Sequence, residues 1–350
     1  MFKLKHDKPW AAAGYTQMAE QIKIKDAEAT DYTQAGNSDM DIIETGDRLT
    51  YIWDGMAAVF DKEQGTLSAL LRGDRILIVP GHGPKLDLFR APVNNDIWIW
   101  DDWFKNGLYD LRHKVVDSKS TADGNGNYSL TFTIESQALH PGRMIGGNGN
   151  SRGEYGIEEN DSVTFGADDF HVTSVVTWTM MPGGKVKLDA EIIPSDSTLI
   201  LPRVGYALEL PRNMYDKVEY YGRGPEENYR DRCTGQFIGV YDLPVSKMFT
   251  DYTRPQNNGN REEVRWIKFE GPSQQVSFSS PGTMAVTVSP YTEMELFKAD
   301  HPFRLPKSDR LVVHLDAFMT GLGGASCGQG GPLEQDRATG EKYNFTVIIN

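Results

Sequence analysis

The sequence predicts an all-β protein whose main body is one large antiparallel β-sandwich over about residues 38–350. Apolar and polar residues alternate with a period of two in many short segments, as in half-buried strands. Turn residues are dense, with 35 glycines and 18 prolines among 350 residues, and helical periodicity is weak. In the clearest alternating segment the apolar positions are Val186, Leu188, Ala190 and Ile192.

The first residues differ from the rest. Gln21–Lys25 alternates like a strand, and the polar residues 26–38 have the composition of a linker. A strand pair without further strands cannot form a stable unit. We therefore expect residues 1–30 to be the remnant of a preceding β-sandwich domain with its linker, and the chain to be a fragment of a longer protein.

Within the main body, residues 40–60 predict a meander with strands at 40–45, 48–54 and 55–60, because glycine marks the turns. Further strands are predicted at 170–179 and 343–349. Hairpin tips are expected at 123–127 and 182–184, and a polar surface loop at 146–153. The weak helical signals predict two short helices, at 101–108 and at 291–299.

Composition excludes several classes of function. Lys plus Arg is 36 and Asp plus Glu is 49, and the net charge of −13 argues against nonspecific nucleic-acid binding. The sequence contains no run of 18 apolar residues, so no membrane-spanning helix is expected, and residues 1–10 lack the apolar core of a signal peptide. We expect a soluble protein, cytoplasmic or periplasmic, with no nucleic-acid or membrane partner. Cys233 and Cys327 alone make no zinc site, and the histidines show no metal spacing, so no metal is expected in this chain.

The first candidate stretch, residues 89–98, places one guanidinium, two amides and a carboxylate beside aromatic rings. Such groups suit hydrogen bonding to sugar hydroxyls, and aromatic rings suit sugar faces. The alternative is that Arg90 and Asp96 satisfy backbone groups of a buried loop. The residues of interest are Arg90, Asn94, Asn95, Asp96 and Trp98.

Two further stretches are unusual. In residues 220–232, charges of both signs predict an arginine–carboxylate network, but the adjacent Glu226 and Glu227 would point to opposite faces of a strand. They therefore do not fit the carboxylate pair of a retaining glycosidase. In residues 316–328, a Gly-x-Gly-Gly run lacks the context of a dinucleotide site. Its glycines indicate that the backbone closely approaches a ligand or another domain. Cys327 has no evident histidine partner for nucleophilic catalysis.

Together these stretches resemble the small-chain domain of β-galactosidases of glycoside hydrolase family 2. Four motifs, in order, carry the resemblance over roughly residues 38–350: Arg90-Ala91-Pro92-x-Asn94-Asn95-Asp96-Ile97; Gly222-x-Gly224-Pro225-x-Glu227-Asn228-Tyr229-x-Asp231-Arg232; Tyr252 with Pro255-x-Asn257-Asn258-Gly259-x-Arg261; and Asp316-x-Phe318 with Gly321-x-Gly323-Gly324. Residues 10–25, from Trp10-Ala11-Ala12-Ala13-Gly14-Tyr15 through Gln21-Ile22-Lys23-Ile24-Lys25, resemble the last strands of an immunoglobulin-like domain.

The resemblance implies a supersandwich of the galactose-mutarotase-like type, completing the active-site mouth of a retaining β-galactosidase. The two catalytic glutamates would lie on a TIM barrel of the same polypeptide that precedes this chain, so the fragment alone is expected to be inactive. Magnesium and sodium, implied for the full-length enzyme, would be held mostly by the missing part. The full-length enzyme is expected to be a homo-oligomer acting on a galactoside or a related sugar.

Two departures from the family pattern bear on the substrate. Relatives carry a sugar-contacting Trp shortly after the Gly-x-Gly-Gly run, where this chain has Cys327 or Gly328. Relatives also have a mobile loop that begins with Gly where this chain has Trp98. We expect Trp98 or Trp100 to replace the lost aromatic contact. The predicted sugar-contacting residues are Arg90, Asn94, Asn95, Asp96, Trp98, Cys327 and Gly328, with no catalytic residue among them.

Two other functions stay open. A free-standing carbohydrate-binding module would need exposed aromatics on one sheet face, and an aldose epimerase would need a positioned acid and base. The β-galactosidase interpretation further predicts that the loops 90–96 and 321–328 lie together on one rim. It also predicts that Arg90 is held by a carboxylate or by backbone carbonyls.

Overall fold

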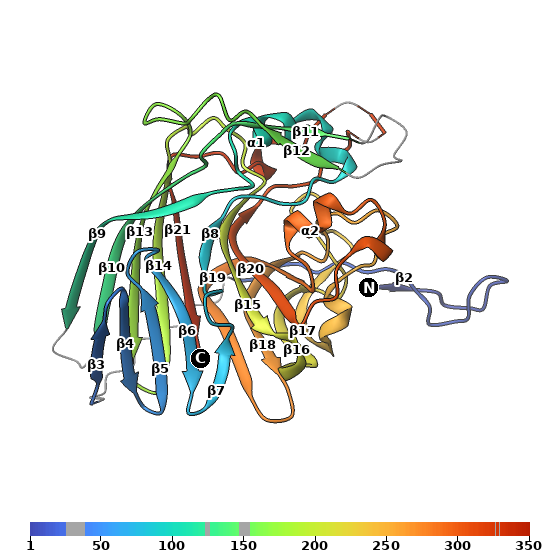
Figure 1. Cartoon of the computed structure of the whole chain (residues 1–350). Coiled ribbons are helices and arrows are strands. Elements are labelled where there is room, and N and C mark those ends of the chain that lie inside the picture. Colours follow the sequence, from blue (N-terminus) through green and yellow to red (C-terminus); the bar gives the residue numbers. More distant parts are fainter. Residues whose placement is uncertain (26–38, 123–126, 147–154, 326, 329) are drawn as a thin grey trace.

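The computed structural model describes residues 1–25, 39–122, 127–146, 155–325, 327–328 and 330–350. Of these residues, 49% lie in strands and 9% in helices, which confirms the predicted all-β class. Two large antiparallel sheets form the body, and a small hairpin at the N-terminus stands away from it (Figure 1).

The smaller of the two sheets is the predicted meander with two more strands. Its five strands follow chain order: β3 (Asp41–Thr45), β4 (Arg48–Trp53), β5 (Met56–Asp61), β6 (Thr66–Arg72) and β7 (Arg75–Ile78). Alternation sets which face is buried. Tyr51 and Trp53 lie two residues apart on β4, so both side chains point to the same, inward face. Phe60 of β5 points inward as well, because the pairing of β4 with β5 places it on that face.

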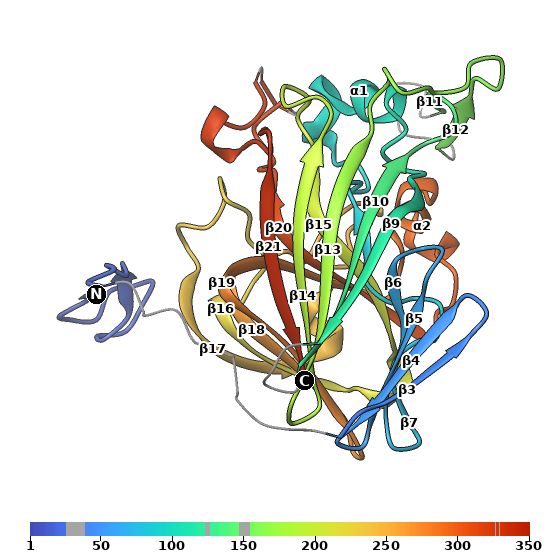
Figure 2. The same ribbon diagram turned by 90° about the vertical axis from the view of Figure 1, so that its left-hand side faces the viewer.

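The larger sheet has twelve antiparallel strands and runs in the order β17-β16-β18-β19-β21-β14-β13-β10-β9, with β20, β15 and β8 branching from β19. Figure 2 shows its long strands side by side. The bounds are β8 (Lys85–Asp87), β9 (Arg112–Ala122), β10 (Tyr128–Gln137), β13 (Val172–Met181), β14 (Lys185–Pro194), β15 (Arg203–Pro211), β16 (Lys217–Gly224), β17 (Phe237–Pro244), β18 (Arg261–Glu270), β19 (Gln275–Ser289), β20 (Arg310–Met319) and β21 (Tyr343–Ile349).

The core lies between the two sheets. Trp178 of β13 packs against Phe60 of β5, with ring centroids 5.6 Å apart. Trp53 of β4 donates from its indole nitrogen to the Met181 carbonyl oxygen at 2.8 Å. Since the four apolar positions that alternate in the sequence are all buried in β14, the period-two prediction is confirmed there.

Short elements occupy the ends of the sandwich. Both predicted helices exist, but they are shorter than expected: α1 is Trp100–Lys105 and α2 is Glu293–Lys298. Thr292 caps α2, because its hydroxyl accepts from the Glu295 amide at 3.2 Å. The remaining elements are η1 (Asn94–Trp98), β11 (Gly142–Ile145), β12 (Gly156–Glu159), η2 (Arg212–Met214), η3 (Val245–Met248), η4 (Pro302–Arg304) and η5 (Glu334–Asp336).

The predicted turns have different outcomes. Residues 182–184 join β13 to β14, with Gly183 and Gly184 at φ 78° and 74°, so this hairpin is confirmed. The tip at 123–127 and the loop at 146–153 fall mostly outside the described residues.

The N-terminal residues form a hairpin of β1 (Phe2–Lys3) and β2 (Thr16–Met18). The predicted strand at Gln21–Lys25 is wrong, because these residues form no strand in the described part of the chain. Instead the side-chain amide of Gln21 donates to the Ile238 carbonyl oxygen at 2.9 Å, and its oxygen accepts from the Ile238 amide at 2.6 Å, on the edge strand β17. The assignment of residues 1–30 to a preceding domain stays a prediction.

Candidate functional site

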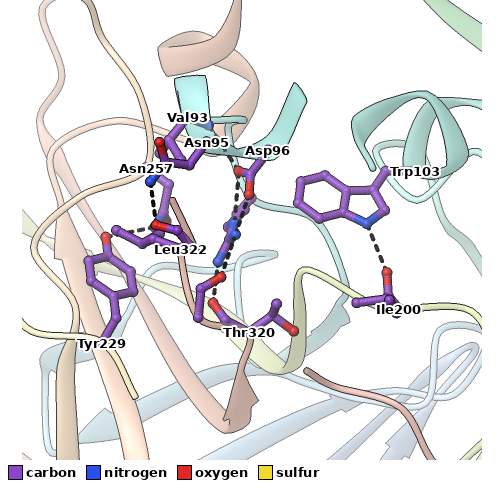
Figure 3. Close-up of polar contacts among 12 residues, drawn as sticks. Val93, Asn95, Asp96, Trp103, Ile200, Tyr229, Asn257, Thr320 and Leu322 are labelled. Atoms are coloured by element: carbon purple, nitrogen blue, oxygen red, sulfur yellow. Dashed lines mark hydrogen bonds and ion pairs between the residues drawn. The ribbon is translucent and has the colours of Figure 1, made fainter. Parts of the chain in front are cut away.

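Arg90 lies in the loop between β8 and η1, where its side chain is fully buried. Its guanidinium donates to both carboxylate oxygens of Asp96, from Nε at 3.2 Å and from Nη2 at 2.5 Å. It also donates to the carbonyl oxygens of Thr320 and, at 3.2 Å, Gly321. Figure 3 shows two of these partners, Asp96 and Thr320. Arg90 is thus held by a carboxylate and by backbone carbonyls, as predicted.

These contacts bear on two of the predicted sugar contacts. Arg90 and Asp96 are 0% and 1% exposed, and Asp96 also accepts from the Val93 amide at 3.0 Å. Their hydrogen-bonding groups face the protein interior. The structure therefore shows the alternative that the sequence left open, in which the two residues satisfy a buried loop.

The loop 90–98 and the glycine-rich loop that follows β20 lie together on one rim, as predicted. The side-chain nitrogen of Asn95 donates to the Gly323 carbonyl oxygen at 2.7 Å. Asp231 accepts from the backbone amides of Leu322, at 3.0 Å, and Gly323, at 2.6 Å. A carboxylate that accepts two neighbouring amides fixes the path of a glycine-rich segment that has few side chains of its own to pack.

The third motif joins the same rim. The Asn257 backbone amide donates to the Ala91 carbonyl oxygen at 3.0 Å, and its side-chain nitrogen donates to the Tyr229 hydroxyl at 3.0 Å (Figure 3). Glu227 accepts from the Gly259 amide at 2.7 Å and from the Tyr252 hydroxyl. All four sequence motifs therefore meet at one place.

An open pocket of about 300 Å³ lies where the motifs meet, and we call it the rim pocket. Of the predicted sugar contacts, Asn94 and Asn95 line it. Asn94 is exposed, whereas Asn95 is buried against the glycine-rich loop. The lining residues are Val93, Asn94, Asn95, Glu227, Tyr229, Arg232, Tyr252, Gln256, Asn257 and Leu322.

Sequence reasoning missed several lining residues. Glu227, Tyr252 and Asn257 belong to the sequence motifs but are not among the predicted sugar contacts, and Gln256 occupies the variable position between Pro255 and Asn257. Their membership in motifs from distant parts of the chain was the available signal. The spacing of these residues in the sequence does not show that four separate segments of the chain close around one pocket.

Trp98, Cys327 and Gly328 are not among the residues that line the rim pocket. The Trp98 ring packs on Gly331, where an added Cβ would lie 2.3 Å from a ring carbon. The Arg337 guanidinium covers the same ring, 5.2 Å from its centroid. Trp98 is half-buried, and Cys327 and Gly328 are exposed on the glycine-rich loop. Trp98 thus supports the last loops of the chain.

The chemistry of the rim pocket is that of hydrogen bonding. Burial raises the pKa of Tyr252 to about 12, with the Glu227 carboxylate as the next cause, and burial holds the pKa of Tyr229 well above its usual value. Both hydroxyls therefore keep their protons at neutral pH. Glu227 is the one carboxylate among the lining residues, whereas retaining glycoside hydrolysis needs two flanking the sugar.

The described residues form neither a metal-binding cluster nor a membrane-spanning helix. Within the described part of the chain, no three His, Cys, Asp or Glu residues gather in a group that could hold a metal ion. No helix among the described residues has the length and apolar character needed to cross a bilayer.

Fold and site define a large antiparallel β-sandwich domain with a polar, hydrogen-bonding pocket on one rim. The chain belongs to the β-galactosidase small-chain family, whose model matches residues 53–349. It is 26% identical over 324 residues to a β-galactosidase of Priestia megaterium, covering 92% of this chain and 28% of that protein. It is also 26% identical over 364 residues to a β-galactosidase of Psychromonas ingrahamii, covering 99% and 31%.

The chain thus spans about three-tenths of the length of these curated relatives. A shorter stretch of 150 residues is 35% identical to a β-galactosidase of Lactobacillus delbrueckii subsp. bulgaricus and covers 43% of this chain. Among solved structures, an aldose epimerase homologue from C. elegans aligns over 89% of this chain and 98% of its own, with a TM-score of 0.42 and 8% identity.

Proposed function

We propose that this chain is the domain of a retaining β-galactosidase that forms one wall of the active-site mouth. In this proposal two glutamates on a TIM barrel of the same polypeptide do the chemistry, and the rim pocket contributes recognition of a galactoside or a related sugar. The observation that carries the proposal is that all four family motifs converge on one open, polar pocket.

The lining groups suit a sugar. Asn94 and Gln256 offer amide donors and acceptors, the Tyr252 hydroxyl keeps its proton, and Arg232 brings charged donors to the pocket edge. Arg232 is also fixed in place, because Nη2 donates to the Gly323 carbonyl oxygen at 3.3 Å. Such an array can exchange hydrogen bonds with several hydroxyls of one ring.

The number of carboxylates in the rim pocket indicates that catalysis belongs to another part of the enzyme. Because Glu227 is the one carboxylate in the lining, and the Gly259 amide and Tyr252 hydroxyl already occupy it, the rim pocket lacks a nucleophile with an acid partner. Catalysis is therefore assigned to the barrel. Among the described residues no three His, Cys, Asp or Glu side chains gather to hold a metal ion, so magnesium and sodium are proposed for other parts of the enzyme. The full-length enzyme is proposed to be a homo-oligomer.

The test uses this chain alone. Nitrophenyl β-galactoside should not be hydrolysed, and lactose should shift the NMR signals of the Asn94 and Gln256 side-chain amides. The Gln137 amide, which donates to the Gly166 carbonyl oxygen outside the rim pocket, serves as the unaffected control. Hydrolysis that disappears in Glu227→Gln would overturn the proposal.

The same experiment separates the two other functions. A free-standing carbohydrate-binding module would bind sugar at a sheet face without shifts at the rim pocket. An aldose epimerase would accelerate the interconversion of galactose anomers, followed by polarimetry. Either result would replace the proposed function.

A further inference from the structure

Four buried residues form a closed ring of hydrogen bonds at the rim pocket. Arg203 of β15 donates from Nη1 to Glu293 Oε1 and from Nη2 to Asn257 Oδ1, both at 3.2 Å. Glu293 Oε2 accepts from the backbone amide of Ala91 at 2.6 Å, and the Ala91 carbonyl oxygen accepts from the backbone amide of Asn257 at 3.0 Å. We call Ala91, Arg203, Asn257 and Glu293 the support ring. Asn257 is thus held by its backbone and by its side chain.

The support ring fixes which way round the side-chain amide of Asn257 lies. A guanidinium has donors and no acceptor, so the Asn257 atom that faces Arg203 has to be the oxygen. The Asn257 nitrogen then faces the Tyr229 hydroxyl, to which it donates at 3.0 Å (Figure 3). The reverse orientation would place two sets of donors against each other and lose a buried hydrogen bond to a charged group. Since arginine stays protonated in proteins, this orientation requires no titrating group.

The bond from Asn257 determines what the Tyr229 hydroxyl can offer to a ligand. Its oxygen accepts from Asn257, and no other described residue makes a hydrogen bond with it. The ring is buried and the hydroxyl keeps its proton, because burial holds the pKa of Tyr229 well above its usual value. Tyr229 lines the rim pocket, so its proton is available to a ligand there.

Tyr252 offers the opposite polarity in the same pocket. Its hydroxyl donates to Glu227 Oε1, and Glu227 Oε2 accepts from the Gly259 amide at 2.7 Å, which holds the carboxylate in place. With its own proton engaged, the Tyr252 oxygen can only accept from a ligand. The rim pocket therefore contains one tyrosine that donates and one that accepts.

We propose that Tyr229 is a specificity-determining donor of the rim pocket, and that Arg203 and Asn257 are positioning residues that set its polarity. Tyr229 selects a sugar oxygen that accepts a hydrogen bond, whereas Tyr252 selects a hydroxyl that donates one. That the ligand is a sugar rests on the proposed function. The polarity of Tyr229 rests on the support ring alone.

The polarity can be tested without a ligand. Neutron diffraction from a crystal of this chain in deuterated buffer locates the exchanged deuterons directly. Two deuterons should lie on the Asn257 atom beside Tyr229 and none on the atom beside Arg203. The Tyr229 deuteron should point into the rim pocket. A Tyr229 deuteron directed at Asn257 would overturn the proposal.

Variants test the consequence for binding. Asn257→Asp puts an acceptor where Asn257 has its donor, so the Tyr229 hydroxyl should turn to the new carboxylate and be lost to the ligand. In lactose titrations followed at the Asn94 side-chain amide, Asn257→Asp and Tyr229→Phe should each lower the affinity about two- to tenfold. The double variant should show no further loss, because both changes remove the same donor.

Tyr252→Phe is the matched control. Tyr252 shares no hydrogen-bond partner with Asn257, so its effect on affinity should add to that of Asn257→Asp. Fully additive losses from Asn257→Asp and Tyr229→Phe would contradict the positioning role of Asn257. Circular dichroism checks that each variant is folded, and the neutron experiment on wild type decides the polarity even where one is not.

Failure of the proposed function gives a different result. In that case lactose produces no shifts at Asn94 or Gln256, while the neutron structure still shows the Tyr229 deuteron in the rim pocket. The polarity set by Arg203 and Asn257 then stands, and the assignment of a sugar as the ligand is overturned.

Discussion

Arg90 and Asp96, six residues apart, form a two-pronged ion pair that is wholly enclosed by protein. The same guanidinium reaches across to the end of β20, so a local pair also fastens two distant segments. A polar group buried at this depth is stable only with its partners in place. The rim pocket therefore depends on residues that never reach its surface.

Removal of one member of this pair should be costly. Arg90→Ala leaves the Asp96 carboxylate buried without its cation, and loss of one partner of a buried pair typically costs about 3–5 kcal/mol. Urea unfolding followed by circular dichroism measures the change. Arg112→Ala, whose exposed side chain lies 3.7 Å from Asp110, is the control and should change stability by less than about 1 kcal/mol. Equal losses in the two variants would contradict the structural role given to Arg90.

The fold could be predicted from alternation because the sandwich buries one face of most strands. β14 shows this most clearly, since its buried and half-buried residues alternate along its whole length. Gln21–Lys25 alternates as well, yet Ile22 and Ile24 are 78% and 97% exposed. Alternation indicates a strand only where a neighbouring backbone accepts its hydrogen bonds, and the sequence does not say where one is available.

The candidate site could be predicted only in part. The motifs named the right loops, but residue type did not tell a buried arginine from an exposed one. Arg90 and Arg232 both belong to motifs, and only Arg232 lines the rim pocket. The distinction comes from the fold, which pairs Asp96 with Arg90 and buries both side chains.

Glu262 predicts a specific dependence of stability on pH. The Glu262 side chain is buried, and Oε1 accepts from the side-chain nitrogen of Asn260 at 2.9 Å. Burial raises the pKa of the Glu262 carboxyl from 4.5 to about 7. Burial favours the protonated form of the Glu262 carboxyl. Glu262 therefore makes its full contribution to the stability of the folded state below pH 4.5, and this contribution is lost as the pH rises through 7. The difference between the two pKa values corresponds to about 3 kcal/mol of stability.

Unfolding of wild type and Glu262→Gln between pH 4.5 and 8 measures this contribution. Glutamine stays neutral, so the variant should gain about 3 kcal/mol relative to wild type over that range. Glu226→Gln, at an exposed position, should run parallel to wild type throughout. A constant difference between Glu262→Gln and wild type would show that Glu262 ionises freely in the fold.

Trp98 should act through the loops that it supports. Trp98→Ala removes the ring from between Gly331 and Arg337, and loss of a partly buried indole should cost roughly 1–3 kcal/mol. Amide hydrogen exchange should accelerate in residues 330–337. Trp98→Phe keeps an apolar ring and should restore much of the protection. If exchange there is unchanged while lactose shifts vanish, Trp98 contacts the sugar directly, as the sequence led us to expect.

The neighbouring residues Asn94 and Asn95 should separate recognition from stability. Asn95 is buried and donates to the Gly323 carbonyl oxygen at 2.7 Å, so Asn95→Ala leaves that bond unmade and should cost about 1–3 kcal/mol. Asn94 is exposed in the rim pocket, and Asn94→Ala should change stability by less than about 0.5 kcal/mol. In lactose titrations followed by NMR, Asn94→Ala should weaken the shifts of the Gln256 amide several-fold. Native binding in Asn94→Ala, alongside unchanged stability in Asn95→Ala, would mean that neither amide has the role its position indicates.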